Sequence, residues 1–102
     1  MEVFKRPQFL LDLARELTRL NTKAGADVAE RWYQGLSHTI DELARHPFLG
    51  RERLDLKSKN IRSWRVNDFP HWLVLYTVRD EALILLRVCN GARKLEELEM
   101  KG

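Results

Sequence analysis

Residues 61–88 read IRSWRVNDFPHWLVLYTVRDEALILLRV, and this stretch decides the fold. It holds three runs rich in aliphatic, β-branched and aromatic residues, at 61–66, 72–78 and 82–88, with short polar segments between them. Runs of this composition are typical of β-strands, and separations this short join neighbouring strands into hairpins. The stretch therefore predicts a three-stranded antiparallel meander.

The sequence before the meander predicts a pair of helices. Apolar residues recur at three- and four-residue spacing from about residue 8 to 21, just after Pro7, and again from about 25 to 45, where His46 and Pro47 end the pattern. Two amphipathic helices joined by so short a link should lie antiparallel, each burying one apolar stripe. Residues 1–5 are compatible with a first strand, and residues 94–101 with a short helix.

These segments together predict one α+β domain over residues 1–102, in the order β-α-α-β-β-β with a small terminal helix. The helix hairpin should cover one face of a small, mainly antiparallel sheet and leave the other face open for function. Strict alternation in the last strand would place Leu83, Leu85, Arg87 and Cys89 on one side. We expect Arg87 to point to the side that the helices leave open.

The composition limits the class of protein. The chain has a single cysteine, so it can form no intrachain disulfide, and we expect a cytoplasmic protein. Its longest apolar runs have the length of strands, far short of the roughly 20 residues that a membrane-spanning helix needs. The first residues also lack the apolar segment of a signal peptide. We therefore expect no membrane partner.

The sequence offers little for acid–base, metal or nucleophilic chemistry. The histidines at 38, 46 and 71 fall on a helix, at a helix end and in a turn, without the spacing of a metal site or a catalytic triad. Cys89 lies at a strand end, where a thiol is usually a small packed hydrophobe. We expect no cofactor and no metal, and we assign no catalytic residue.

Positive charge is concentrated in one segment. The net charge is only +3, from 18 Lys and Arg against 15 Asp and Glu, yet residues 51–65 hold six basic residues and two acidic ones. A solvated loop explains such a run about as well as an acidic or polyanionic partner does. Interleaving of Trp64 with Arg62 and Arg65 fits a single-stranded nucleic-acid surface and equally a hot spot in a protein interface.

Two further arginines surround the end of the last strand. Arg87 lies within an apolar strand pattern, where an arginine is costly to bury without a partner, and Arg93 follows just past the Gly91 turn. The alternatives are a solvated strand end and, together with the residues above, one surface that contacts another molecule. Its predicted members are Arg62, Trp64, Arg65, Trp72, Arg87 and Arg93.

Two long segments carry a resemblance to a known family. They are AERWYQGLSHTIDELARHPFLGRERLDL (29–56) and IRSWRV (61–66) followed by FPHWLVLYTVRDEALILLRVCNGARKL (69–95). Their marks are the L-x-x-x-P-x-x-G exit from the second helix, at Leu43, Pro47 and Gly50, and the closing L-R-V-x-x-G-A-R at 86–93. In order and spacing these motifs resemble the ParE branch of the RelE/ParE toxin superfamily, which includes plasmid stabilisation proteins.

The resemblance implies the toxin of a bacterial type II toxin–antitoxin system. A co-encoded, ParD-like antitoxin would keep it inactive by wrapping it with a C-terminal segment, and the apolar rim of the helix hairpin and the sheet edge would offer the groove. ParE-like members inhibit DNA gyrase, whereas RelE-like members cut ribosome-bound mRNA. Neither activity implies sequence-specific binding of DNA by the toxin itself.

The residues distinguish these two branches. Cleavage in the RelE group relies on arginines and a C-terminal tyrosine; this chain keeps Arg93 but has Glu99 where the tyrosine would fall. The strand arginine of those nucleases is replaced by Trp72 or Leu73. A gyrase inhibitor that acts by binding is therefore the first expectation. The alternatives are a RelE-like mRNA endonuclease and a non-toxic RNA-binding module.

Overall fold

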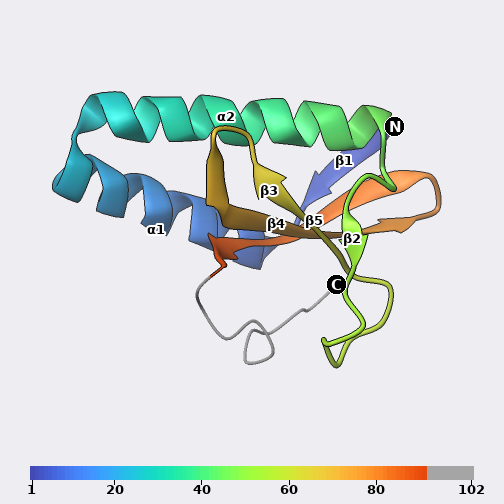
Figure 1. Ribbon diagram of the computed structural model, residues 1–102. Helices are drawn as coiled ribbons and strands as arrows, with labels where there is room; N and C mark the ends of the chain where they lie inside the picture. The colour runs from blue at the N-terminus through green and yellow to red at the C-terminus, as the bar shows by residue number, and fades with distance from the viewer. Residues whose placement is uncertain (92–102) are drawn as a thin grey trace.

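The computed structural model describes residues 1–91, so the predicted helix at 94–101 lies outside the described residues. The predicted α+β fold is confirmed, with one further short strand. The sheet has the strand order β1-β5-β4-β3-β2, in which β1 runs parallel to β5 and the other neighbours are antiparallel (Figure 1). The elements are β1 (Glu2–Lys5), α1 (Pro7–Ala24), α2 (Ala26–Arg45), β2 (Arg51–Glu52), β3 (Arg62–Val66), β4 (Phe69–Arg79) and β5 (Ala82–Asn90).

The two helices form the predicted antiparallel hairpin on one face of the sheet (Figure 1). Helix α1 begins at Pro7, whose missing N–H costs nothing at the first helical position. Gly25 alone separates the helices and has a φ of 99°, which favours glycine. The apolar stripes of both helices meet the sheet in one core, which contains Phe9, Trp32 and Leu36. Trp32 is therefore a core residue.

Helix α2 is fastened to the turn between β3 and β4. The Thr39 hydroxyl accepts a hydrogen bond from the backbone N–H of Asn67 at 2.7 Å and donates one to the carbonyl of Gly35 at 3.0 Å. Gly35 lets the turn approach this closely, because a Cβ at that position would collide with the carbonyl oxygen of Asn67. A polar contact and a small residue thus set the distance between helix and sheet.

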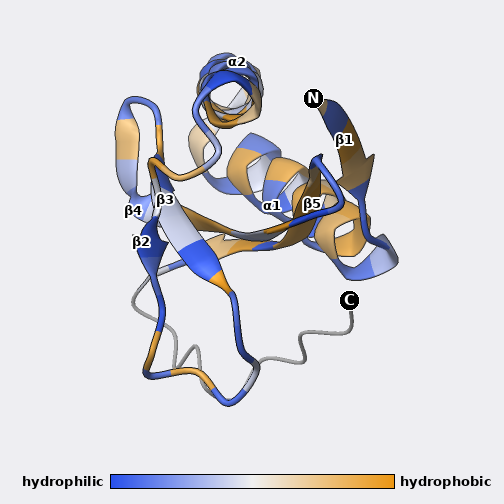
Figure 2. Ribbon diagram, turned by 90° about the vertical axis from the view of Figure 1, so that its right-hand side faces the viewer, coloured by the Kyte–Doolittle hydropathy of each residue, from blue (hydrophilic) through white to orange (hydrophobic). Residues whose placement is uncertain are grey.

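The opposite face of the sheet carries a second apolar cluster. Its members among residues 1–91, none of which lies on α1 or α2, are Leu56, Ile61, Leu73, Leu75, Ile84, Leu86 and Cys89. Leu56 and Ile61 come from the segment between β2 and β3, which extends below the sheet in Figure 2. The expectation that this face is left entirely open is therefore wrong, since that segment covers part of it.

A β-bulge in β5 corrects the predicted alternation. Leu75 pairs with Arg87 and Tyr76 pairs with Leu85, so Leu86 is an extra residue in β5. Strict alternation placed Arg87 on the side of Leu85, and that prediction is wrong for a simple reason: the extra residue shifts the pattern by one.

The packing of the side chains on either side of Leu86 agrees with this shift in register. Leu83 and Leu85 pack in the core with the helices, whereas Cys89 belongs to the second cluster. Arg87 lies opposite Leu75, a member of the second cluster, as expected for the face away from the helices. Its guanidinium binds a helix residue, Asp12 of α1.

Candidate functional site

Arg87 is held by helix α1. Its Nε and one terminal nitrogen donate to the two carboxylate oxygens of Asp12 at 2.7 and 2.9 Å. The same carboxylate accepts the backbone N–H of Val88 at 3.1 Å. Both charged residues are buried. A predicted contact residue is thus part of a buried ion pair that joins the hairpin to the sheet, and the sequence reading missed Asp12 altogether.

The position of this ion pair follows from the sheet. Strand β1 pairs with β5 only from Ala82 to Leu85, and the ladder ends where the N–H of Arg6 donates to the carbonyl of Leu85 at 3.0 Å. Beyond that point the edge of β5 needs another acceptor for its backbone. Asp12, one turn into α1, supplies it to Val88, and this role explains a carboxylate on an otherwise apolar helix face.

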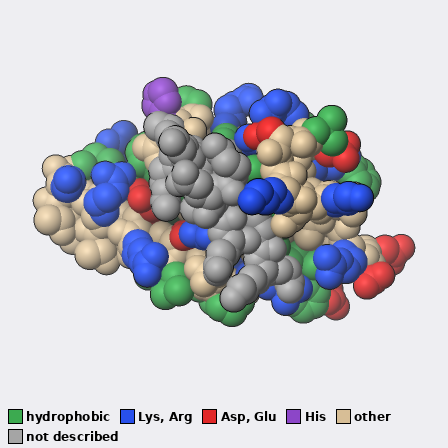
Figure 3. Space-filling view, turned by 90° about the horizontal axis from the view of Figure 1, so that it is seen from below, with side chains coloured by type: hydrophobic (Ala, Val, Ile, Leu, Met, Phe, Trp, Pro, Cys, Tyr) green, Lys and Arg blue, Asp and Glu red, His purple; other side chains and the backbone are tan. Residues whose placement is uncertain are grey.

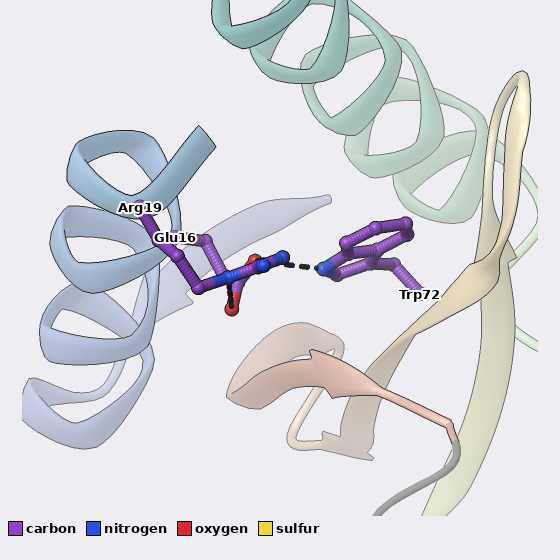
Figure 4. A network of polar contacts seen from close by, with 3 residues as sticks. All are labelled: Glu16, Arg19 and Trp72. Atoms are coloured by element: carbon purple, nitrogen blue, oxygen red, sulfur yellow. Dashed lines mark hydrogen bonds and ion pairs between the residues drawn. The ribbon is translucent and has the colours of Figure 1, made fainter. Parts of the chain in front are cut away.

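Trp72 links β4 to α1 through a second network, shown in Figure 4. Its indole N–H donates to Glu16 at 3.0 Å, and Arg19 pairs with the same carboxylate at 3.0 Å. The Arg19 guanidinium also lies 5.9 Å from the centroid of the indole ring. The ring packs against the main core and stands edge-on to Phe69. Trp72 is therefore partly buried and polar contacts fix its orientation.

Arg62 supports the segment that leaves α2. One of its terminal nitrogens donates to the carbonyl of Gly50 at 2.8 Å, and its guanidinium lies 5.0 Å from the centroid of the Phe48 ring. Beside it, the buried Tyr76 hydroxyl accepts the N–H of Gly50 at 2.9 Å and donates to the carbonyl of Pro47 at 2.7 Å. Two side chains of the sheet thereby hold the segment 47–50, called the exit segment because the chain leaves α2 through it.

Tyr76 was not singled out from the sequence, although it lies within the apolar run 72–78. Burial raises the pKa of Tyr76 above its ordinary value, while the Gly50 hydrogen bond and the charge of Arg62 oppose the shift. The phenol is therefore neutral and acts as a hydrogen-bonding group between β4 and the exit segment.

Among the predicted site residues within 1–91, Arg65 is the most exposed, and it contacts Trp64. The Arg65 guanidinium lies 4.5 Å from the centroid of the Trp64 ring, and Arg65 is exposed. Trp64 pairs with Val74 and packs against the main core, whereas Arg65 pairs with Leu73 of the second cluster. An exposed cation over a half-buried indole is a suitable contact for a partner.

The predicted surface residues therefore do not form one patch. Arg62 and Trp64 lie on the helix side of β3, and the guanidinium of Arg65 lies over the Trp64 ring. Arg87 is instead joined to α1 near the other edge of the sheet. Arg93 lies outside the described residues, so its place in the surface stays a prediction.

The basic segment 51–65 is divided between internal and exposed charges. Arg53 is buried and donates to both carboxylate oxygens of Asp55, at 2.8 and 2.6 Å. This hydrogen bonding holds the pKa of Asp55 at about 2, below its ordinary 3.8. The exposed members are Arg51, Lys57, Lys59 and Arg65. Figure 3 shows Lys and Arg side chains spread over the underside of the molecule, where a polyanionic or acidic partner would meet positive charge.

The histidines do not converge. His38, His46 and His71 are all exposed, on α2, at its C-terminal end and on β4. Within residues 1–91 no group of three or more His, Cys, Asp or Glu side chains is placed to hold a metal ion. Neither of the two helices described there is long and apolar enough to cross a bilayer.

Comparison with known proteins agrees with this architecture. No curated protein matches the sequence. Among solved structures, the fold is similar to the chromosomal ParDE toxin–antitoxin system from P. aeruginosa, with a TM-score of 0.73 and 14% identity over 88% of this chain and 95% of that one. It is also similar to the conserved hypothetical protein HP0894 from Helicobacter pylori, with a TM-score of 0.55 and 22% identity over 91% of this chain and 97% of that one.

These structural likenesses show a shared fold at low sequence identity. The sequence itself supplies the family, because residues 3–95, nearly the whole chain, match the family model described as the ParE toxin of the type II toxin–antitoxin system parDE. The resemblance drawn from the helix exit and the closing strand is confirmed. The chain belongs to the ParE toxin family of type II toxin–antitoxin systems.

Proposed function

We propose that this protein is a cytoplasmic toxin that inhibits DNA gyrase by binding it and that a cognate ParD-like antitoxin neutralises it. The observation that carries the proposal is Trp72. Trp72 and Leu73 are the two residues of β4 that stand where RelE-like nucleases carry a phosphate-binding arginine, and neither is an arginine. The indole of Trp72 packs on the core and donates to Glu16. An apolar ring fixed in this way cannot stabilise the charge of a phosphate in a cleavage reaction.

The distribution of possible proton-transfer groups also favours binding over cleavage. General acid–base cleavage of RNA needs two such groups within reach of one 2′-hydroxyl and one leaving oxygen. The three histidines are exposed, two of them on α2 and at its C-terminal end and the third on β4, and Tyr76 is buried as a neutral phenol beside the exit segment. A toxin of this kind works by occupying a surface of its target.

A supercoiling assay with purified gyrase tests the proposal. Addition of the toxin should block supercoiling, and prior addition of the antitoxin should restore it. In parallel, mRNA on translating ribosomes should remain intact in the presence of the toxin. Intact gyrase activity together with cleaved mRNA would replace the proposal by the RelE-like alternative. RNA affinity without growth arrest on expression would instead favour the RNA-binding module.

The helix hairpin supplies a surface suited to the antitoxin. Leu10, Leu11 and Tyr33 are large apolar side chains exposed on the two helices, and Phe4 is exposed on the edge strand β1. Tyr33 also lines a hollow between the end of α1 and the start of α2. An unfolded segment that becomes ordered on binding could cover these side chains. The solved structure described as a ParDE system supports a ParD-like partner.

Calorimetry tests this part of the proposal. Titration of the C-terminal peptide of the antitoxin into the toxin should give tight association with a negative change in heat capacity, because apolar surface is buried. A heat-capacity change near zero would count against a groove of this kind.

A further inference from the structure

The exit segment Pro47–Gly50 presents two adjacent apolar side chains to solvent. Phe48 is 65% exposed and Leu49 is 38% exposed. Single exposed apolar residues are ordinary on protein surfaces. Here two stand side by side in the sequence, and the Arg62 guanidinium lies over the ring of the first. Arg51, also exposed, follows the segment directly.

The backbone of this segment is fixed by buried or half-buried side chains. The Tyr76 hydroxyl binds the N–H of Gly50 and the carbonyl of Pro47, and Arg62 binds the carbonyl of Gly50. The N–H of Leu49 donates to the carbonyl of His46 at 3.1 Å. Gly50 is required for this approach, since a Cβ there would collide with the Tyr76 hydroxyl. Most backbone N–H and C=O groups of the segment thus have hydrogen-bond partners within the protein, which fixes its conformation.

Exposed apolar side chains on a fixed backbone favour a role in binding another protein. Phe48 and Leu49 add little to the core because they are exposed, yet a fully buried tyrosine and an arginine fix their backbone. Fixing apolar anchors before binding lowers the entropy lost on association, and aromatic residues beside arginine are typical of interface hot spots.

The shape of the surface selects the kind of partner. With 65% of its surface exposed, Phe48 projects from the protein, so the partner must supply the concave side. A folded protein can offer such a pocket, whereas an antitoxin segment that folds on binding needs a groove on the toxin. A nucleic-acid backbone would satisfy Arg51 and Arg62 but offers no apolar pocket for Leu49.

We propose that Phe48 and Leu49, flanked by Arg51 and Arg62, dock into an apolar pocket with an acidic rim on the target protein of this toxin. The inference rests on the proposed function, in which the toxin acts by binding gyrase, and assigns to it the exit segment as the target-contacting surface. The antitoxin then binds elsewhere, on the helix hairpin.

The test compares three variants of the full chain. Phe48→Ser and Leu49→Ser combined remove both anchors, and Leu49→Ser alone removes one. Leu54→Ser is the matched control, since Leu54 is a leucine on the neighbouring loop and is 87% exposed. All three positions are exposed, so the fold should persist, which circular dichroism and antitoxin affinity verify. The readouts are the toxin concentration that halves gyrase supercoiling and the dissociation constant of the antitoxin.

The double variant should need at least about tenfold more protein to inhibit gyrase, as expected for loss of a hot spot. Its antitoxin affinity should stay within about threefold, and Leu54→Ser should resemble the original protein in both assays. Unchanged gyrase inhibition by the double variant would overturn the inference, and so would an equal loss in the control.

Growth arrest in cells separates this inference from the proposed function. If the original protein arrests growth without inhibiting gyrase, the choice of target fails. The exit segment is then judged by toxicity alone. Loss of toxicity in the double variant, with antitoxin binding kept, supports the surface for another target protein, whereas full toxicity overturns it. A double variant that arrests growth normally but no longer binds antitoxin assigns the segment to the antitoxin and also overturns the inference.

Discussion

Asp12 in α1 and Arg87 in β5 form a buried ion pair between residues 75 positions apart in the sequence. Each is only 6% exposed, and two hydrogen bonds join their side chains. The third bond of Asp12, to the N–H of Val88, lies where β1 no longer covers the edge of β5. The Asp12 carboxylate thus neutralises the buried Arg87 and accepts the backbone N–H of Val88 at the edge of the sheet.

Arg87→Ala should therefore destabilise the fold by about 3–5 kcal/mol, because it leaves the carboxylate of Asp12 buried without its cation. Urea denaturation measures the change. Loss of toxicity in Arg87→Ala would thus report on folding first, whatever the target contacts. The double variant Asp12→Asn with Arg87→Met serves as the control: it removes both charges and keeps a side-chain acceptor for Val88. It should be the more stable of the two, and a cost below about 1 kcal/mol for Arg87→Ala would refute the assigned role.

Tyr76→Phe removes the hydroxyl that joins β4 to the exit segment. The Gly50 N–H and the Pro47 carbonyl lose their partner, and the change should cost about 1–3 kcal/mol of unfolding free energy. Tyr33→Phe is the matched control, because Tyr33 is exposed and its loss should stay within about 0.5 kcal/mol. Thermal and urea unfolding of both variants measure the two changes. Equal losses of unfolding free energy would show that the buried hydroxyl of Tyr76 contributes no more than an exposed one.

The same tyrosine should make stability depend on alkaline pH. Burial raises the pKa of Tyr76 above 10.0, so the folded state retains the phenolic proton when the unfolded chain has lost it. Its contribution is fully present below pH 10.0 and is lost as the pH rises through the raised pKa of the folded state. Unfolding free energies measured across this range should fall more steeply for the original protein than for Tyr76→Phe. Identical slopes would rule out the coupling.

The fold could be predicted because its main elements are coded locally. Period-three and period-four apolar spacing marks the helices, and β-branched runs between polar turns mark β3, β4 and β5. The two-residue strand β2 escapes such patterns because it has no periodicity of its own and exists only by pairing with β3. The bulge at Leu86 is likewise invisible in the sequence, where five apolar residues in a row, Ala82–Leu86, are compatible with either register.

The candidate site was harder to predict, because polar partners are distant in sequence. The sequence suggested Arg62, Trp72 and Arg87 as contacts for another molecule. In the structure their partners are the Gly50 carbonyl, Glu16 and Asp12. An arginine in an apolar strand does indicate a partner, as desolvation requires, but it does not say whether that partner belongs to the same chain. The available signal for these partners was a pair of acidic residues four positions apart on α1, Asp12 and Glu16, which therefore lie on the same face of the helix.

Arg65 and Arg93 remain as the predicted arginines without an assigned structural role, and they give the last prediction. Arg65 is exposed over the Trp64 ring, so Arg65→Ala should change the unfolding free energy by less than about 0.5 kcal/mol. If either arginine contacts the target or an acidic part of the antitoxin, its loss should weaken that association by roughly 1–3 kcal/mol. Gyrase inhibition and antitoxin affinity, measured on Arg65→Ala, Arg93→Ala and the double variant, distinguish the two partners. Arg79→Ala is the matched control, an exposed arginine at the end of β4, and should leave both associations unchanged. A folded double variant that keeps full toxicity and full antitoxin affinity would show that these two charges serve solubility alone.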